Sequence, residues 1–249
     1  MAATLGWRIF LRSLLVQSSW NFSGMQNLGY FFMTWPALSR RGLSAPELRE
    51  AGLRHLRQFN THPYLAGLVA ATVVRSEQYG QTEEGTEELK RSLMCALGAV
   101  GDEFFWATLR PFAAIVALPA AIAGFAWAPL ILLAVFNVPH LTVRLWGIRV
   151  GLARGSGIVE MLQRRPFSRA LPALGTATTA LIGFLVGSGA SDRFWGLIPG
   201  HGLLSAAAAA AVFALLLTLQ FRGLGQGRLL AYLSAVTAVA GAVFVMRAP

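Results

Sequence analysis

A short stretch near the middle of the chain combines two carboxylates, a tryptophan and an arginine. Asp102 and Glu103 are adjacent, and Trp106 and Arg110 follow Asp102 at intervals of four residues. In a helix this spacing places Asp102, Trp106 and Arg110 on one stripe. Carboxylates accept hydrogen bonds from sugar hydroxyl groups and an aromatic ring stacks on a sugar face, so the stretch could belong to a sugar site. It could equally form a charge network that fixes helix packing, or contact the phospholipid interface.

A second polar group surrounds Asn60 and His62, just ahead of Pro63. The imidazole of His62 could carry a proton or bind a ligand. A histidine before a proline at a turn could also serve only as a structural hydrogen-bonding residue. The neighbours of His140 and His201 give no reason to assign a function to either.

The first forty residues place a polar apex between two short apolar arms, at residues 9–16 and 30–35. This pattern predicts either a re-entrant hairpin or a pair of interfacial helices, and the residues alone do not choose between them. Non-helical backbone at membrane depth is tolerated only where protein or a cavity covers it. The apex and its flank include Ser19, Trp20, Asn21 and Gln26.

Several classes of chemistry lack the residues that they need. No CxxC, HExxH, Walker or GxSxG motif occurs in the sequence, so we expect no metal and no cofactor. Cys95 is the only cysteine, which excludes an intramolecular disulfide, and its apolar setting predicts a small buried residue. The net charge of +10 comes almost entirely from arginines that flank apolar segments. That placement predicts contact with lipid headgroups and no nucleic-acid partner.

Long uncharged runs predict an all-α integral membrane protein. Hydrophobic residues make up 55% of the 249 residues and charged residues only 13%, against about a quarter in soluble domains. Runs without Asp, Glu, Lys or Arg cover residues 111–143, 170–191 and 194–221. About 20 such residues are enough to span a bilayer as a helix. Because Arg12, Ser13 and Gln17 interrupt the first apolar run, we expect no secretory signal peptide.

The residues from Ser44 to Glu47 are typical of a helix start. Ser44 can cap the helix, Pro46 suits its first turn, and Glu47 completes a capping box. Arginines then alternate with apolar residues, which predicts an amphipathic surface helix that ends near residues 60–63. Beyond it we expect an apolar segment too short to span, a polar acidic loop and a second helix, at residues 65–74, 78–88 and 87–99 respectively.

The longest uncharged stretch should form two helical segments joined near Gly124. One helix over residues 112–143 would be roughly 48 Å long, well beyond the ~30 Å hydrocarbon core. The six arginines of residues 144–169 predict a basic loop, which the positive-inside rule places in the cytoplasm. The same rule places residues 222–228 inside and 191–201 outside. The three spans expected in this half of the chain are residues 171–190, 203–220 and 229–246.

The order and spacing of these polar groups resemble the IID subunit of mannose/fructose/sorbose-type phosphotransferase systems. That family opens with Ser-Trp-Asn before Met-Gln and Leu-Gly, continues with Phe-Asn-Thr, and then has Gly-Asp followed by Phe-Trp, Thr and Arg-Pro. The match covers residues 10–155 and is weak from residue 158 onward. The residues that carry it are Ser19, Trp20, Asn21, Met25, Gln26, Leu28, Gly29, Phe59, Asn60, Thr61, Gly101, Asp102, Phe105, Trp106, Thr108, Arg110, Pro111, Phe136, Asn137, Gly147, Gly151 and Gly155.

The resemblance implies the mannose-type permease IID fold, with re-entrant helical N-terminal elements and several transmembrane helices. It implies one membrane domain over residues 1–249, with the family signature in 1–155 and weakly matching transmembrane helices in 156–249. It further implies a multi-pass protein of the bacterial inner membrane, surrounded by lipid, that pairs with a IIC membrane subunit to form a hexose pathway. Cytoplasmic IIA and IIB subunits would carry the phosphohistidines, so neither a phosphorylation site nor enzyme activity is expected of this chain.

The resemblance also points to particular residues. Those expected to line or brace the pathway near the IIC subunit are Asn60, His62, Asp102, Glu103, Trp106 and Arg110. Further positions of the family signature are Ser19, Trp20, Asn21, Gln26, Gly101 and Asn137. An alternative is a regulatory or scaffold protein of an incomplete phosphotransferase system that moves no sugar. It is motivated by the weak match of the C-terminal part and by residues 95–98, which replace the family's glycine-proline segment.

Overall fold

The computed structural model describes residues 2–163, 171–179 and 181–182, and its regular elements there are helices. The chain divides into two compact units, Met1–Leu174 and Gly175–Pro249, and every helix named below lies in the first. The helices are α1 (Ala2–Ser13), α2 (Asn27–Leu38), α3 (Ala45–His55), α4 (Ala66–Gln78), α5 (Glu83–Gly101), η1 (Asp102–Leu109), α6 (Arg110–Ile122), α7 (Ala128–Arg154), η2 (Gly155–Gly157) and α8 (Ile158–Gln163).

Much of the predicted C-terminal half cannot be compared with the structure. Residues 171–179 are helical and begin the first of the three expected spans. The other two spans, 203–220 and 229–246, lie outside the described residues. So do the loops at 191–201 and 222–228.

The first two helices form the predicted pair of short arms around a polar apex. α1 and α2 pack together, and the chain between them makes successive turns. A close approach at Gly29 holds the pair, because a Cβ atom there would lie 2.1 Å from the carbonyl oxygen of Val16. Whether this hairpin is re-entrant or interfacial stays a prediction.

α3 begins as predicted, since the Glu47 carboxylate accepts hydrogen bonds from the backbone N–H (2.8 Å) and the hydroxyl (2.7 Å) of Ser44. It ends at His55, five residues before the predicted end at residues 60–63. α4 follows and is the core of the unit, with ten of its thirteen residues buried. This burial explains why an apolar segment too short to cross a membrane is nevertheless helical.

Glycines allow α4 and α7 to pack unusually closely. A Cβ atom on Gly67 of α4 would lie 2.9 Å from the Ile148 side chain. On α7, a Cβ atom on Gly151 would lie 2.9 Å from both the Ala71 side chain and the Leu68 carbonyl oxygen. Small residues at helix crossings of this kind are typical of membrane proteins, where association depends on close van der Waals contact.

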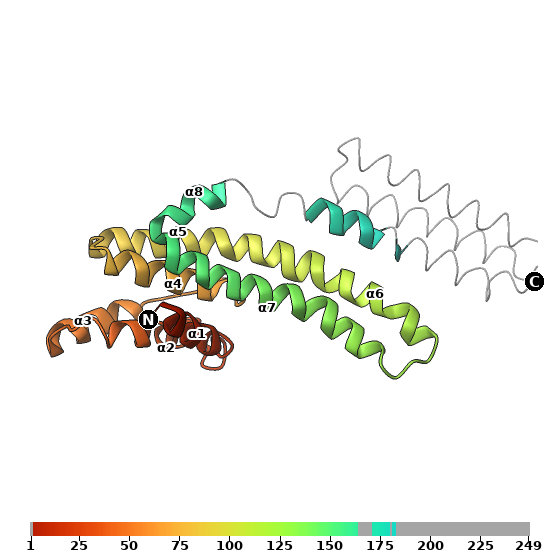
Figure 1. Cartoon of the computed structure of the whole chain (residues 1–249), viewed down its shortest axis with the longest axis horizontal. Helices are drawn as coiled ribbons and strands as arrows, with labels where there is room; N and C mark the ends of the chain where they lie inside the picture. The colour runs from red at the N-terminus through yellow and green to blue at the C-terminus, as the bar shows by residue number, and fades with distance from the viewer. Residues whose placement is uncertain (1, 164–170, 180, 183–249) are drawn as a thin grey trace, which may run out of the picture. The chain divides into compact units, whose positions relative to one another are not determined.

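The predicted break in the long apolar stretch is confirmed. α5, η1 and α6 follow one another as one long rod, the chain turns at Gly124 (φ +79°), and α7 returns alongside (Figure 1). Glu83–Ala121 and Ala128–Leu162 are long and apolar enough to cross a membrane. Most of each apolar window is not buried inside this chain. Such extended apolar surface requires lipid or a second protein to cover it.

Three local expectations are wrong. The acidic loop is confined to the turn before Glu83, because Thr82 caps α5 by accepting a hydrogen bond from the Gly85 N–H (3.2 Å). The basic loop is instead the last part of α7 followed by η2 and α8, as far as Gln163. Cys95 is exposed and does not fill the core.

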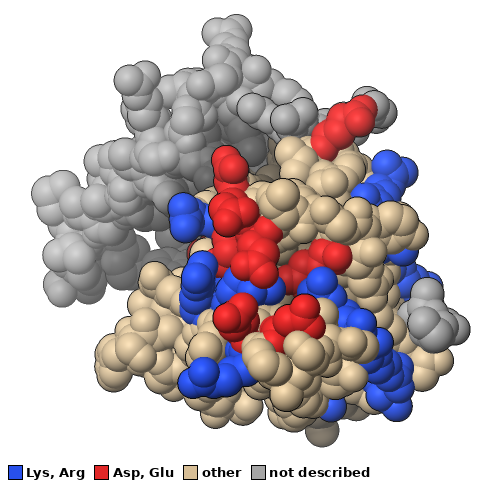
Figure 2. Space-filling view, turned by 90° about the vertical axis from the view of Figure 1, so that its left-hand side faces the viewer, with Lys and Arg blue, Asp and Glu red and all other residues tan. Residues whose placement is uncertain are grey.

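Charged residues concentrate at one end of the unit, where α3, α4 and α5 meet. Seven of the eleven acidic residues of the chain lie between Glu47 and Glu88. Figure 2 looks onto this end and shows acidic side chains gathered together with arginine and lysine side chains between and around them. The ion pairs here, which we call the charged network, are Arg41–Glu77 (3.1 Å), His55–Glu77 (3.1 Å), Arg54–Glu83 (2.6 Å), Arg57–Glu87 (3.7 Å) and Lys90–Glu87 (3.3 Å).

Candidate functional site

The predicted sugar-type stretch forms a π-helix, η1, inside the first candidate span. π-Helical turns are rare and occur frequently at functional sites. Within it, the Thr108 hydroxyl donates to the Glu103 carbonyl oxygen at 2.8 Å, five residues back. Phe104, Phe105 and Leu109 face the core. The exposed residues of the stretch are Asp102, Glu103, Trp106, Ala107 and Arg110.

The exposed charges of this stretch have no partner in the described part of the chain. Among the residues that the structure describes, none forms a hydrogen bond or ion pair with the side chain of Asp102, Glu103 or Arg110. Ionisable groups in membrane segments are costly and usually face a cavity or a partner protein. We call these three residues with Trp106 the unpaired cluster.

His62 packs directly behind the unpaired cluster. It is buried, its ring stacks on Phe105 (centroids 5.0 Å apart, planes at 15°), and it meets Trp106 edge-on at 4.9 Å. Gly101 makes this possible, because a Cβ atom there would lie 2.3 Å from the Cβ of His62. The structure therefore brings together three of the expected residues, Gly101, His62 and Trp106.

The environment of His62 bears on its chemistry. Burial, together with the nearby Arg144 and His140, lowers the pKa of His62 to about 4. A group with that pKa is neutral near pH 7. This argues against His62 as a proton carrier at neutral pH and favours a role in packing or in binding a neutral ligand.

A second layer of aromatic and polar residues extends this packing to α7. Tyr64 meets Phe105 edge-on and stacks on His140 with 3.8 Å between ring centroids. His140 Nδ1 lies 3.2 Å from Asn137 Oδ1, which brings this predicted residue to the edge of the group. The guanidinium of Arg144 lies 5.2 Å above the Tyr64 ring and donates to the Ser13 hydroxyl at 3.0 Å.

Three buried nitrogen atoms in this group have no hydrogen-bond partner among the residues that the structure describes: Nε2 of His62, Nε2 of His140 and Nε of Arg144. Buried polar atoms are nearly always satisfied, and exceptions mark places where water, an ion or a ligand belongs. The packing behind the unpaired cluster thus contains hydrogen-bonding nitrogen atoms that no described residue satisfies. Among the described residues, no group of three or more His, Cys, Asp or Glu could hold a metal ion.

The N-terminal part of the signature serves as a scaffold for this region. The Gln26 side chain donates to the Thr61 carbonyl oxygen (3.0 Å) and accepts from the Thr61 N–H (3.2 Å). Asn21 closes the preceding turn by accepting from the Gly24 N–H at 2.8 Å and donating to Asn27 Oδ1 at 3.0 Å. The Gln26 bonds fix the backbone next to His62, and the Asn21 bonds fix the turn that leads into α2, so both side chains hold other residues in position.

The remaining expected residues lie apart from these contacts. Asn60 is exposed, and Trp20 is exposed with its ring edge-on to Phe22. Ser19 contributes only its carbonyl oxygen, 3.5 Å from Asn21 Nδ2. The residues missed from the sequence are Tyr64, His140 and Arg144. His140 and Arg144 could have been found from the sequence, because they share one face of an otherwise apolar helix with Asn137.

A comparison with known proteins identifies the family of the chain. Residues 3–191 match the family described as "PTS system mannose/fructose/sorbose family IID component". The chain belongs to this family. The resemblance drawn from the sequence is thereby confirmed, and IID components are subunits of sugar transporters.

Individual relatives of this IID component cover only part of its length. The PTS system mannose-specific EIID component of Escherichia coli K12 is 37% identical over 158 residues, covering 61% of this chain and 56% of the relative. The fructose permease IID component of Bacillus subtilis is 30% identical over 159 residues, covering 62% and 58%. The sorbose-specific component of Klebsiella pneumoniae is 33% identical over 157 residues, covering 61% and 57%. The matched region is therefore little more than half of each relative.

Solved structures agree over nearly the whole chain. One, described as "Structure of membrane protein", has a TM-score of 0.67, 24% identity and coverage of 96% of both chains. A chain from the complex of the mannose transporter ManYZ with microcin E492 has a TM-score of 0.59, 24% identity and coverage of 98% of this chain and 96% of its own. At this identity the likeness shows the fold, that of an all-α integral membrane protein.

Proposed function

We propose that this IID component is a membrane subunit of a mannose-type phosphotransferase permease. With a IIC membrane subunit it forms the pathway for hexose uptake, and cytoplasmic IIA and IIB proteins phosphorylate the sugar as it enters. It lies in the bacterial inner membrane as a multi-pass protein and has no phosphorylation site of its own. Family membership and the mannose transporter among its structural neighbours support this assignment.

The observation that carries the proposal is the unpaired cluster. Asp102, Glu103 and Arg110 are exposed on a candidate membrane span and have no partner among the described residues. Charges in that position usually face a second protein or a polar cavity. A IIC subunit that shares a sugar pathway with this surface would supply both.

Uptake of radiolabelled hexoses tests the proposal. Cells that express IIA, IIB, IIC and this chain should accumulate labelled, phosphorylated sugar, and cells that lack only this chain should not. Equal uptake in the two strains would overturn the transport role. The regulatory alternative, in which the chain assembles with these proteins without being needed for uptake, predicts that result. The relatives named above are permease components, so we do not adopt that alternative.

The Asp102→Asn variant separates a pathway role from a structural one. The substitution removes the charge and nearly preserves the shape. If the complex with IIC still co-purifies and uptake is lost, Asp102 acts in the pathway. If the complex no longer forms, Asp102 belongs to the subunit interface. Full uptake by an Asp102→Asn, Trp106→Ala double variant would exclude the unpaired cluster from the site.

A further inference from the structure

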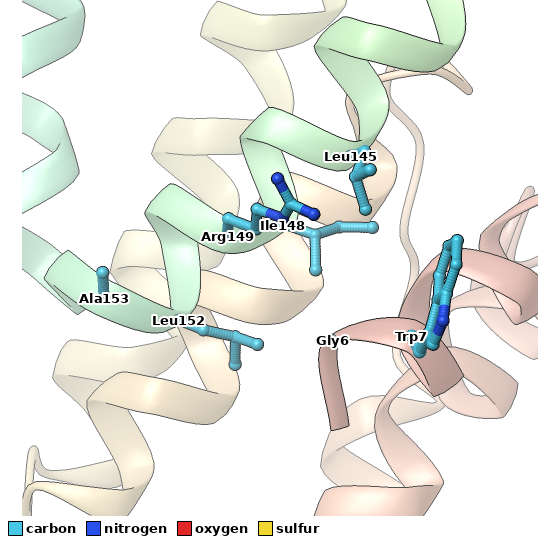
Figure 3. Close-up of a pocket in the computed structure, with 7 residues that line it drawn as sticks. All are labelled: Gly6, Trp7, Leu145, Ile148, Arg149, Leu152 and Ala153. Carbon is cyan, nitrogen blue, oxygen red and sulfur yellow. The ribbon is translucent and has the colours of Figure 1, made fainter. Parts of the chain in front are cut away.

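An apolar groove runs between α1 and the last third of α7 (Figure 3). It encloses about 370 Å³, within the size range of ligand pockets. Leu145, Ile148 and Leu152 line one wall, with the spacing of a single helix face, and Trp7 lines the other. Gly6 also lines the groove opposite Leu152 and Ile148, and it has no side chain to fill the space between them.

One cation stands in this apolar setting. Arg149 lines the groove, is exposed, and has no ion-pair or hydrogen-bond partner among the described residues. No acidic residue occurs on either helix: the first Asp or Glu of the chain is Glu47, and residues 104–159 contain none. The other charged side chains of the two helices, Arg8, Arg12, Arg144 and Arg154, are all positive. The charged side chains of these two helices therefore make the electrostatic potential at the groove positive.

The position of Arg149 along α7 matches the level of lipid phosphates. The uncharged run that ends at Val143 marks the part of the helix that is suited to hydrocarbon. Arg149 lies six residues further on, about 9 Å along the axis. Trp7 on the opposite wall is a residue type that is enriched at the same interfacial depth. An apolar slot that opens toward a cation at this level has the two parts of a phospholipid site.

We propose that this groove binds one anionic phospholipid, with an acyl chain against Leu145, Ile148 and Leu152 and the phosphate group on Arg149. The ligand is a lipid and not a free phosphate ion, because most of the lining is apolar and only one side chain offers a charge. The site is separate from the unpaired cluster and does not depend on sugar transport. Its occupation ties α1 to α7, the two helices that also meet through Arg144 and Ser13.

Lipid binding to the full chain, purified in mild detergent, tests the proposal. Native mass spectrometry would count bound phosphatidylglycerol and phosphatidylcholine with identical acyl chains during titration. The wild-type protein should retain one phosphatidylglycerol molecule at about tenfold lower concentration than phosphatidylcholine. Both headgroups contain a phosphate, but the choline ammonium offsets its charge and is repelled by Arg149, whereas phosphatidylglycerol keeps a net negative charge. Inorganic phosphate at millimolar concentration should not displace the lipid.

Two matched pairs of variants locate the site. Arg149→Gln should lose the preference for phosphatidylglycerol, while Arg154→Gln, the same change outside the groove on the same helix, should keep it. Gly6→Ala should bind normally, since a Cβ atom there makes ordinary contacts of 3.5 Å to Leu152 and 3.9 Å to Ile148. Gly6→Leu should fill the slot and abolish retention of either lipid. Thermal unfolding of each variant confirms that it is folded.

The proposal would be overturned if Arg149→Gln retained phosphatidylglycerol as wild type does, or if the wild-type protein showed no headgroup preference. It would also be overturned if the wild-type protein retained no lipid while Gly6→Leu weakened binding of a IIC subunit. In that case the groove is a protein interface. Displacement by inorganic phosphate alone would identify a simple anion site in place of a lipid site.

Discussion

The charged network and the unpaired cluster both contain acidic and basic residues, but their charges differ in whether they have partners. In the network, Glu77 is buried between Arg41 and His55, and Glu87 contacts both Arg57 and Lys90. In the cluster, Asp102, Glu103 and Arg110 lie on the surface of an apolar rod without any such contact among the described residues. The first set of charges is satisfied within the chain, whereas no described residue satisfies the second set.

This difference separates residues that stabilise the fold of the chain from residues that we expect to contact a second protein. A buried carboxylate paired with an arginine and a histidine contributes to the stability of the isolated chain, and its removal leaves buried polar groups without their partner. An exposed carboxylate without a contact contributes little to that stability. The unpaired cluster is held in place by the uncharged packing behind it, from Gly101, His62 and Phe105. Four experiments test this comparison.

The largest effect is expected from Gly101→Ala. The new Cβ atom would lie 2.3 Å from the Cβ of His62, so α5 and the 60–64 segment must separate. We expect the free energy of unfolding to fall by about 3 kcal/mol or more, because such overpacking forces backbone shifts. Thermal or denaturant unfolding in detergent measures it.

Gly98→Ala is the matched control for that change on the same helix. Its nearest neighbour, Thr61, would lie 3.9 Å from the added Cβ atom. Stability should stay level or rise by about 0.5–1 kcal/mol, since alanine favours a helix over glycine. Equal effects of the two substitutions would show that the contact with His62 does not position the cluster.

Glu77→Gln should weaken the charged network. Glu77 is buried, and its carboxylate contacts both Arg41 and His55. We expect a loss of about 2 kcal/mol, because the partners lose a charged acceptor in a buried setting. Glu88→Gln, a change of the same kind at an exposed residue of α5, should alter stability by less than about 0.5 kcal/mol. A loss in Glu88→Gln as large as that in Glu77→Gln would remove the distinction between paired and unpaired acids.

The network should also give the isolated chain a dependence on pH. Burial raises the pKa of Glu77, but the hydrogen bond from His55 and the charges of His55, Arg41 and Arg54 outweigh it and lower the pKa below its ordinary value of 4.5. The stabilisation is therefore complete above that value and is lost as the pH falls through the lower pKa of the folded state. Below pH 4.5, the unfolding midpoint of wild type should decline more steeply than that of Glu77→Gln. Equal declines of the unfolding midpoint in wild type and Glu77→Gln would contradict the assignment of this pH dependence to Glu77.

The smallest effect is expected from Asp102→Asn in the isolated chain. Because Asp102 has no contact to lose among the described residues, its stability in detergent should change by less than about 0.5 kcal/mol. In the complex with IIC, the same substitution should lower the temperature at which the subunits separate. A loss in the isolated chain comparable with that of Glu77→Gln would place Asp102 in the fold of the monomer.

Local residue patterns predicted the elements whose cause is local. The capping box at Ser44 and the turn near Gly124 depend on residues within a few positions, and both are present. The acidic residues Glu83 and Glu84 appeared to be loop residues because of their charge. They instead occupy the first turn of α5, where the helix dipole favours negative charge. A single capping residue, Thr82, decided between the two outcomes.

The errors came from contacts between distant parts of the chain. Arg144 was assigned to a cytoplasmic loop, yet it is buried on α7. Its guanidinium donates a hydrogen bond to the Ser13 hydroxyl and lies against the Tyr64 ring. Neither residue is near it in sequence. The π-helical turns of η1 likewise have no signature in the local pattern. The sequence pointed to the stretch that forms η1, but it could not identify Tyr64, from a distant segment, as packing behind that stretch.

The tight crossing of α4 with α7 has a consequence for biosynthesis. α4 ends at residue 78, and α7, on which it packs, is complete only at residue 154, 76 residues later. At about 5–20 residues per second, the ribosome needs roughly 4–15 s to supply it. During this interval an apolar helix too short to span the bilayer packs only on α1, α2 and α5 and lacks α7, its largest contact surface. We expect nascent chains arrested before residue 140 to be sensitive to proteases at α4, and chains arrested well beyond residue 154 to be resistant.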